Sequence, residues 1–302
     1  GDVGCGKTIV AVLISAIAVG NNVQVAIMAP TEILARQHLN SFKEQLDKIN
    51  ISCALLVGKM KKTDRDPIIA GLKNGNISVI IGTHALIQDD VSFQDLGLVI
   101  IDEQHRFGVN QRLSLSKKGD NPHSMAMTAT PIPRTLAITY HGDMDISIID
   151  ELPSDRIPII TKVVEPNRLN KVYKFMRDEV SEGRQCIIVY PLVEESEKSD
   201  LAAAVEAHGE LSKIQFSNLK VGLIHGRMKV EEKDDVIKKF ENNKINVLVS
   251  TTVVEVGIDI PNATVMLVEH AERFGLTQLH QLRGRVGRGA KKSYCILVRR
   301  NI

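Results

Sequence analysis

Several features are scarce in this sequence of 302 residues, and each scarcity argues against a class of protein. Tryptophan is absent and aromatic residues make up only 4% of the chain, which argues against nucleic-acid binding by base stacking on many aromatic platforms. The chain has no run of about 18 apolar residues, so we expect no membrane-spanning helix. The net charge of +2 is nearly balanced, and any surface that binds a polyanion must therefore be local.

Cysteine is also scarce. The four cysteines, Cys5, Cys53, Cys186 and Cys295, lie far apart and form no C-x-x-C pair, which argues against a zinc site and a disulfide framework. Reduced thiols in a cytoplasm are the default for such a pattern. No signal peptide precedes the first motif, which begins at residue 1. Because that motif needs a strand in front of it, we expect the chain to be cut from a longer protein.

Strands and helices alternate along the chain, and its length favours about two domains. Short, continuous apolar runs rich in β-branched residues are typical of buried parallel strands, and amphipathic stretches separate them. This alternation predicts an α/β fold of doubly wound parallel sheets. The predicted strands span residues 23–29, 78–82, 98–102, 124–128, 185–190, 221–224, 246–250, 264–268 and 293–298, and the predicted helices include residues 8–19, 32–49 and 230–241.

A change of composition marks the boundary between the two lobes. Residues 150–158 read Asp-Glu-Leu-Pro-Ser-Asp-Arg-Ile-Pro, and polar segments with prolines commonly connect domains. A new series of strands and helices follows. We therefore predict one lobe over residues 1–152 and a second over residues 153–302. The sequences of the two lobes show no obvious similarity to each other.

The first eight residues fit the phosphate-binding pattern G-x-x-x-x-G-K-[ST]. They read Gly1-Asp2-Val3-Gly4-Cys5-Gly6-Lys7-Thr8. The glycines let backbone N–H groups turn towards phosphate oxygens, and the following helix offers its positive N-terminus to the same anion. Lys7 would reach the β- and γ-phosphates of ATP, and the Thr8 hydroxyl would bind Mg²⁺. The alternative is a glycine-rich turn with a chance lysine, which the apolar helix at the required place disfavours.

Two acids follow an apolar strand at residues 98–101. Acids at the carboxyl end of a strand lie where α/β folds bind ligands. Asp102 is the candidate Mg²⁺ ligand, and Glu103 is the candidate that orients or deprotonates the attacking water. The alternative is an ordinary turn, because many strands end in Asp-Glu, but the phosphate loop upstream favours the catalytic interpretation.

Residues 281–289 (QLRGRVGRG) place arginines among glycines. A guanidinium matches phosphate oxygens with two parallel hydrogen bonds. Arg285 and Arg288 are therefore candidates for an arginine finger that stabilises the transferring phosphoryl group, and Gln281 is a further catalytic candidate in the same segment. The alternative is a basic loop that binds nucleic acid. If this segment and Lys7 serve one nucleotide, ATP lies between the lobes and hydrolysis is tied to their relative motion.

These segments resemble the ordered boxes of superfamily 2 helicases. Lys7, the box at residues 102–105 and the box at residues 281–288 occur in the family's order. The remaining boxes match at residues 29–31 with 34–37 (motif Ia), 82–84 (Ib), 128–131 (III) and 250–252 with 256–259 (V). Seven boxes in order make chance negligible. The resemblance implies two RecA-like lobes with an ATP cleft between them.

Within the superfamily, four segments resemble the RecG helicases. They are DEQHRFGVNQR (102–112), TATPIPRT (128–135), GDMDISIIDELP (142–153) and YPLVEESE (190–197). The transcription-repair coupling factor shares TATPIPRT and GRVGR, but the DELP and PLVEESE segments favour RecG. Cys5 departs from the serine expected in that phosphate loop. The RecG wedge domain and the translocation element after motif VI are not among these residues, so fork specificity cannot be argued from them.

The resemblance also assigns further residues. Gly257 and Asp259 would face the nucleotide, and Thr31, Arg36, Thr83 and Thr252 would contact DNA phosphates. Hydroxyl and backbone N–H groups suit such sequence-independent contacts, although each threonine could instead be an ordinary cap at a strand end. Gln104 and His105 would couple the lobes through hydrogen bonds.

The implied function is that of an ATP- and Mg²⁺-dependent motor on double-stranded DNA. The parent enzyme would remodel stalled forks and Holliday junctions in the bacterial cytoplasm, near the nucleoid. It would act as a monomer, with a single-stranded DNA-binding protein as a further partner and no membrane. Two alternatives stay open: a transcription-coupled motor, and a nucleotide-dependent DNA-binding switch that does not translocate.

Overall fold

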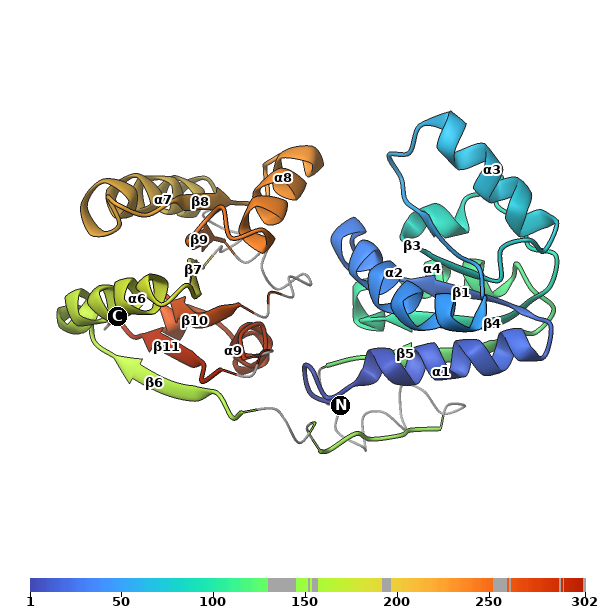
Figure 1. The fold of residues 1–302 in the computed structure, drawn as a ribbon, viewed down its shortest axis with the longest axis horizontal. Coiled ribbons are helices and arrows are strands. Elements are labelled where there is room, and N and C mark those ends of the chain that lie inside the picture. Colours follow the sequence, from blue (N-terminus) through green and yellow to red (C-terminus); the bar gives the residue numbers. More distant parts are fainter. Residues whose placement is uncertain are drawn as a thin grey trace. The chain divides into compact units, whose positions relative to one another are not determined.

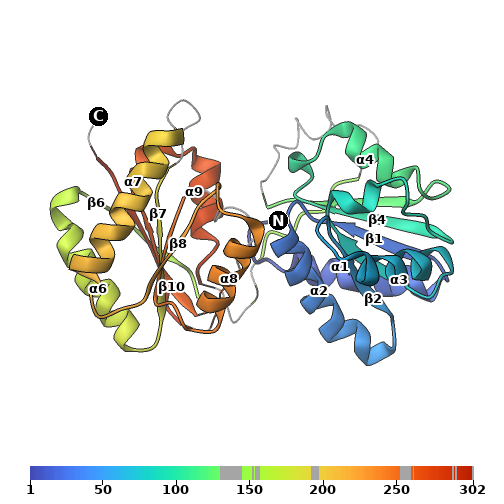
Figure 2. The same cartoon turned by 90° about the horizontal axis from the view of Figure 1, so that it is seen from above.

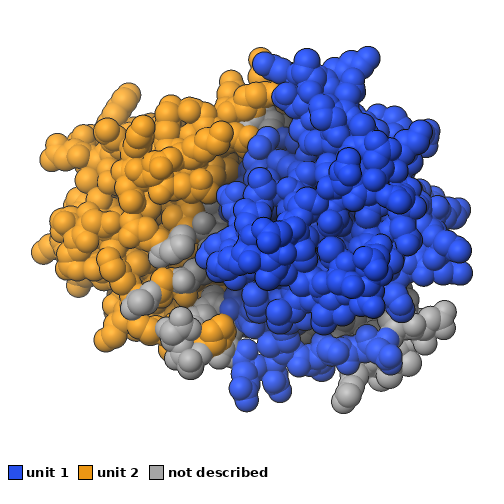
Figure 3. Space-filling model, turned by 45° about the vertical axis from the view of Figure 1, so that its right-hand side comes forward, with its two compact units in different colours: residues 1–152 blue, residues 153–302 orange. Residues whose placement is uncertain are grey.

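The computed structural model describes residues 1–129, 145–151, 153, 157–191, 197–251, 260, 262–287, 289 and 291–300. The chain divides into two compact units, residues 1–152 and residues 153–302 (Figure 3). The division falls inside the proline-containing stretch at residues 150–158. Each unit is an α/β lobe with a parallel sheet, so the predicted fold class is confirmed.

The first unit contains a five-stranded parallel sheet with the order β2-β3-β1-β4-β5 (Figures 1 and 2). Its strands are β1 (Gln24–Met28), β2 (Cys53–Leu56), β3 (Val79–Gly82), β4 (Leu96–Asp102) and β5 (His123–Met127). Its helices are α1 (Lys7–Gly20), α2 (Glu32–Leu46), α3 (Lys62–Lys73) and α4 (Val109–Ser116). Short 3-10 turns lie at η1 (Asp47–Ile49), η2 (His84–Ile87) and η3 (Gln104–Arg106).

Alternate residues of the central strands bury two separate cores, because side chains alternate between the faces of a sheet. On one face, Ala11 of α1 and Phe42 of α2 pack with Ile27 of β1. On the other face, Leu72 of α3 and Leu115 of α4 pack with β4 and β3. Both faces of the sheet are covered, which is why its strands are continuously apolar.

The second unit contains a six-stranded parallel sheet with the order β6-β11-β10-β7-β9-β8. Its strands are β6 (Ile160–Val164), β7 (Gln185–Val189), β8 (Val221–Ile224), β9 (Val247–Ser250), β10 (Ala263–Val268) and β11 (Tyr294–Val298). Its helices are α6 (Leu169–Ser181), α7 (Glu197–Glu210), α8 (Val230–Glu241) and α9 (Leu276–Arg283). Shorter turns lie at η4 (Pro166–Arg168), η6 (Leu211–Gln215) and η8 (Ala271–Arg273).

All nine predicted strands are present within two residues of the predicted bounds, and β8 and α8 match them fully. Two strands were not predicted. One is β2, with only four residues at a sheet edge, and the other is β6, whose residues are mostly exposed. The predicted helix at residues 32–49 ends earlier, because α2 stops at Leu46 and a 3-10 turn continues to Ile49.

The same turn follows one central strand in each unit, which the sequences of the whole lobes did not suggest. Residues 106–108 and residues 273–275 both read Arg-Phe-Gly. Each is preceded by a 3-10 turn, η3 or η8, that begins after a residue in the left-handed region, Glu103 (φ 49°) or His270 (φ 51°). The glycine of each triplet then caps the next helix, α4 or α9.

Candidate functional site

The loop at residues 1–6 has the backbone that the phosphate-binding pattern predicts. Gly4 (φ 76°) and Gly6 (φ 98°) both lie in the left-handed region, where a side chain would be strained. A Cβ atom on Gly1 would lie 2.6 Å from Cys5 Sγ. Helix α1 begins at Lys7, directly after the loop, so its positive N-terminus points into it.

The Lys7 ammonium lies over this loop. Its Nζ donates hydrogen bonds to the carbonyl oxygens of Gly1 and Asp2, both at 2.7 Å, and lies 3.9 Å from Cys5 Sγ. These acceptors are neutral carbonyls, whereas a phosphate oxygen is negatively charged and adds Coulombic attraction to the ammonium. A phosphate would therefore compete effectively for the same ammonium.

Other loop residues hold the shape of the loop. Val3 and Cys5 are buried, the Val3 amide donates to Asp2 Oδ1 at 2.7 Å, and the Cys5 amide donates to the Asp2 carbonyl at 3.3 Å. Thr8, the second residue of α1, is half-buried. The loop is thus preorganised by its own contacts.

Strand β4 lies between β1 and β5 and ends at Asp102. Its side chain is 11% exposed, and its Oδ2 lies 2.8 Å from Nε2 of His38, a residue of α2. No sequence box assigned a role to His38. The sequence places His38 on the apolar face of α2 with Ala35 and Phe42. That position could have indicated a polar partner for His38, because a buried histidine needs one.

Glu103 is held by the neighbouring strand. Its amide donates to the Met127 carbonyl at 2.9 Å, and its Oε2 accepts a hydrogen bond from Thr128 Oγ1 at 3.3 Å. His105 Nδ1 lies 3.6 Å from the same carboxylate oxygen, forming an ion pair when protonated. The sequence predicts Thr128 only as a member of motif III, without a role of its own. The pairing of Asp102 with Met127 places the next two residues, Glu103 and Thr128, side by side.

Thr128 also connects the acid to the phosphate loop. Its carbonyl accepts a hydrogen bond from the Gly1 nitrogen at 3.4 Å. Lys7 in turn contacts the Gly1 carbonyl. The structure therefore brings together the loop, Thr128 and Glu103 at the carboxyl end of the sheet, where α/β folds bind ligands.

These groups fit a nucleotide and a divalent cation. The glycine-rich turn and the Lys7 ammonium offer donors for phosphate oxygens, and the Asp102 carboxylate and Thr8 hydroxyl are the oxygen ligands that Mg²⁺ prefers. Gln104, the buried residue after Glu103, accepts a hydrogen bond from Arg112 Nη1 at 3.2 Å within this unit.

The DNA-contact candidates of the first unit lie at the same edge of the sheet. Thr31 caps α2, because its Oγ1 accepts a hydrogen bond from the Leu34 amide at 3.4 Å, and its hydroxyl hydrogen can still be donated. Thr83 follows β3 and is 2% exposed, and its Oγ1 has no hydrogen-bond partner among the described residues. Arg36 is exposed on α2.

In the second unit, Gln281 and Arg285 are both buried, Gln281 within α9 and Arg285 just after it. The Arg285 amide donates to the Leu282 carbonyl at 3.0 Å, which continues the end of the helix. Four predicted residues, Thr252, Gly257, Asp259 and Arg288, lie outside the described part of the chain.

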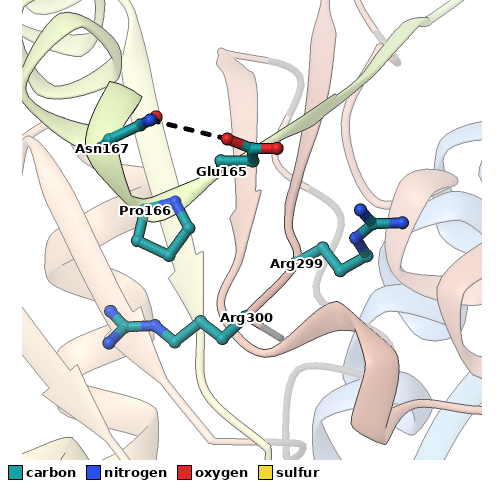
Figure 4. A pocket seen from close by; sticks show the side chains of 5 residues that line it. All are labelled: Glu165, Pro166, Asn167, Arg299 and Arg300. Carbon is teal, nitrogen blue, oxygen red and sulfur yellow. Dashed lines mark hydrogen bonds between the residues drawn. The ribbon is translucent and has the colours of Figure 1, made fainter. Parts of the chain in front are cut away.

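A pair of charged residues that sequence reasoning missed follows β10 and β11. Glu269 is fully buried, its Oε2 accepts from Arg300 Nη2 at 3.3 Å, and its Oε1 has no partner among the described residues. Burial raises the pKa of Glu269, and Arg300 opposes this increase. Beside it is an open pocket of about 350 Å³, where Arg299 and Arg300 point in opposite directions (Figure 4).

None of the described helices is both long and apolar enough to cross a membrane.

Two family profiles match the chain. "DEAD/DEAH box helicase" covers residues 1–138, and "Helicase conserved C-terminal domain" covers residues 167–290. Each profile lies within one of the two units.

Curated relatives match almost the whole chain. The ATP-dependent DNA helicase RecG of Synechocystis sp. is 53% identical over 298 residues, which are 99% of this chain and 36% of that protein. The RecG of Thermotoga maritima is also 53% identical, over 99% of this chain and 38% of that protein. The chain thus spans less than half the length of these relatives.

A solved structure agrees with the sequence matches. The structure of RecG bound to a three-way DNA junction superposes on the whole chain with a TM-score of 0.84 and 49% sequence identity, and the chain covers 39% of it. Sequence, domain order and fold point to the same relatives. The chain therefore belongs to the superfamily 2 DNA helicases and, within them, to the RecG helicases, whose two motor lobes it matches.

Proposed function

We propose that the chain is the ATP-dependent motor of a helicase that remodels branched double-stranded DNA. The observation that carries this proposal is the glycine-rich loop with the Lys7 ammonium over it, together with Glu103 held by the Thr128 hydroxyl at the end of β4. Phosphate binding and water activation need these groups at one end of one sheet. RecG relatives at about half sequence identity support DNA junctions as the substrate.

The proposed chemistry assigns one task to each group. Lys7 and the loop amides bind the β- and γ-phosphates, and Glu103 orients the attacking water and accepts its proton. Thr128 and the left-handed turn at Glu103 keep that carboxylate in place. Thr8 and Asp102 would hold Mg²⁺, which supplies positive charge at the phosphate oxygens when bound.

The first prediction separates binding from turnover. Lys7→Ala should weaken nucleotide binding and hydrolysis together, because it removes the charge that contacts phosphate. Glu103→Gln should bind ATP normally but hydrolyse it slowly, since general-base groups contribute about 10²–10⁴-fold. The measurements are fluorescent-nucleotide titration and phosphate release with DNA present, in a protein that joins this chain to the flanking regions of a RecG relative. Glu44→Gln, on the exposed face of α2, is the control. A Glu103→Gln variant as fast as the wild type would remove Glu103 from catalysis.

We also infer that Arg285 and Arg288 act on the transferring phosphoryl group as arginine fingers. Their charge would match the transition state, so Arg285→Ala and Arg288→Ala should lower the maximal rate by about 10³-fold or more and change ATP affinity little. Arg168→Ala, exposed in the same unit, is the control. If both variants lost only DNA affinity at normal turnover, the segment would be a DNA-binding loop. Gln281, Gly257 and Asp259 belong to the same proposed nucleotide contacts.

The alternative function that is not a motor is a nucleotide-dependent DNA-binding switch, which does not move along DNA. Displacement of a triplex strand from duplex DNA, measured per ATP hydrolysed, distinguishes the two, because only a motor displaces it progressively. For a motor, Thr31, Arg36 and Thr252 are the proposed phosphate contacts, whereas Thr83 is buried and would have to become exposed to serve as one. We further infer, from the family alone, a monomer in the bacterial cytoplasm near the nucleoid that works with a single-stranded DNA-binding protein.

A further inference from the structure

A buried hydrogen bond joins helix α2 to the end of strand β4. His38 Nε2 lies 2.8 Å from Asp102 Oδ2, and the two side chains are only 9% and 11% exposed. The histidine contacts one carboxylate oxygen and does not engage the other, Oδ1. A carboxylate that is held at one oxygen cannot rotate freely, so the direction of its second oxygen is fixed as well.

Packing fixes both partners. His38 shares the buried face of α2 with Ala35, Phe42 and Leu46, and the Phe42 ring meets its ring edge-on, with centroids 6.5 Å apart and planes at 88°. Asp102 is the last residue of β4 and pairs with Met127 of β5. Neither side chain can move far unless the helix or the sheet moves with it.

We propose that His38 is a positioning residue, which orients the Asp102 carboxylate before a cation–nucleotide complex binds. This inference rests on the proposed function, because it takes Asp102 as the ligand of the divalent cation. Hydrogen-bond partners of metal-ligating groups tune metal affinity by about 10–100-fold. Both the neutral tautomer with hydrogen on Nε2 and the cation donate to Oδ2, so the role does not depend on the charge of the ring.

The test compares nucleotide affinity with and without Mg²⁺. His38→Leu keeps an apolar side chain of similar size and removes the donor. With the 302-residue chain and a fluorescent ATP analogue, this variant should lose about 10–100-fold in affinity in Mg²⁺ and lose nothing in excess EDTA. His38→Gln, whose amide nitrogen extends to about the same distance, should restore most of the Mg²⁺-dependent affinity.

A packing control excludes a merely structural role. Phe42→Leu lies on the same face of α2 and makes no polar contact with Asp102. It should lower the melting temperature and leave the Mg²⁺ dependence of affinity as in the wild type. If His38→Leu and Phe42→Leu weakened binding equally in Mg²⁺ and in EDTA, His38 would be a packing residue and the proposal would be wrong.

Two further outcomes have to be distinguished: a His38→Leu variant that does not fold, and a wild-type chain whose nucleotide affinity does not depend on Mg²⁺. If His38→Leu does not fold, His38→Asn replaces it, because its shorter amide is expected to fall short of Asp102 while His38→Gln does not. Asn and Gln variants with the same Mg²⁺ dependence would overturn the proposal. A wild-type chain whose nucleotide affinity is unaffected by Mg²⁺ would instead contradict the proposed metal site itself, and His38 with it.

Discussion

At the scale of single residues, the four cysteines differ sharply in their surroundings. Burial raises the pKa of the Cys53 and Cys295 thiols to about 12, and it raises the pKa of Cys186 as well. All three lie in strands, whereas Cys5 lies in the phosphate loop. Loops open locally at much lower free-energy cost than core strands do. Cys5 should therefore be the cysteine that reacts at neutral pH.

We expect N-ethylmaleimide to modify Cys5 first and to block ATP hydrolysis, and we expect ATP with Mg²⁺ to slow the modification. Peptide mass spectrometry over a time course measures this, with Cys5→Ser as the variant that stays active under the same treatment. First labelling of a strand cysteine, or full activity after modification of Cys5, would show that this side chain does not face the nucleotide.

Local sequence pattern predicts only part of the candidate site. The phosphate loop and the strand that ends in Asp102 and Glu103 have short-range signatures, because a glycine turn and an apolar run are properties of neighbouring residues. His38 and Thr128 could not be assigned in this way. The role of His38 depends on which helix packs near the end of β4, and the role of Thr128 depends on the register between β4 and β5. Neither can be predicted from a short segment of sequence.

At the scale of elements, the buried Glu179 carboxylate joins α6 to β10 and to Arg184, the residue before β7. Glu179 accepts two hydrogen bonds from Arg184, both at 2.6 Å, and a third from Thr264 Oγ1 of β10 at 2.9 Å. Its side chain is 9% exposed. Arg184→Met should destabilise this unit by about 3–5 kcal/mol, because it leaves a buried carboxylate without its charge partner.

Hydrogen exchange of peptides from β7 and β10 measures this loss within the second unit. The matched control is Lys239→Met, which removes an exposed pair with Asp235 on α8 and should cost no more than about 0.5 kcal/mol. Equal changes in the two variants would contradict the assigned role of burial. The strands that the sequence did not predict are β2, which has only four residues, and β6, whose residues are mostly exposed, so neither gives the long buried apolar run of a central strand.

At the scale of the whole molecule, the described residues offer phosphate contacts and no surface that we can assign to a three-way junction. Protein contacts to the DNA phosphate backbone do not distinguish one DNA sequence or shape from another, and the affinity that they provide falls steeply with salt. We therefore expect this chain to bind DNA weakly, with strong salt dependence and little preference for forks over linear duplex. Competition titrations at two salt concentrations, with the Thermotoga maritima RecG in parallel, measure this. A chain that preferred forks as strongly as that relative would place the junction-reading surface within residues 1–302.

The repeated Arg-Phe-Gly turn places two acids in equivalent positions of the two units. When the two turns are aligned, Glu269 of the second unit takes the place of Asp102 in the first, and each turn ends with a glutamine, Gln111 or Gln278, that accepts a hydrogen bond from the capping glycine at 3.1 Å. The two units therefore share the local structure of this turn at the end of a central strand. In one unit the buried acid contacts a histidine, and in the other a permanently charged arginine, Arg300. Of the two aligned acids, Glu269 is thus the one that a permanently charged side chain already neutralises, and this disfavours a metal cation at that position.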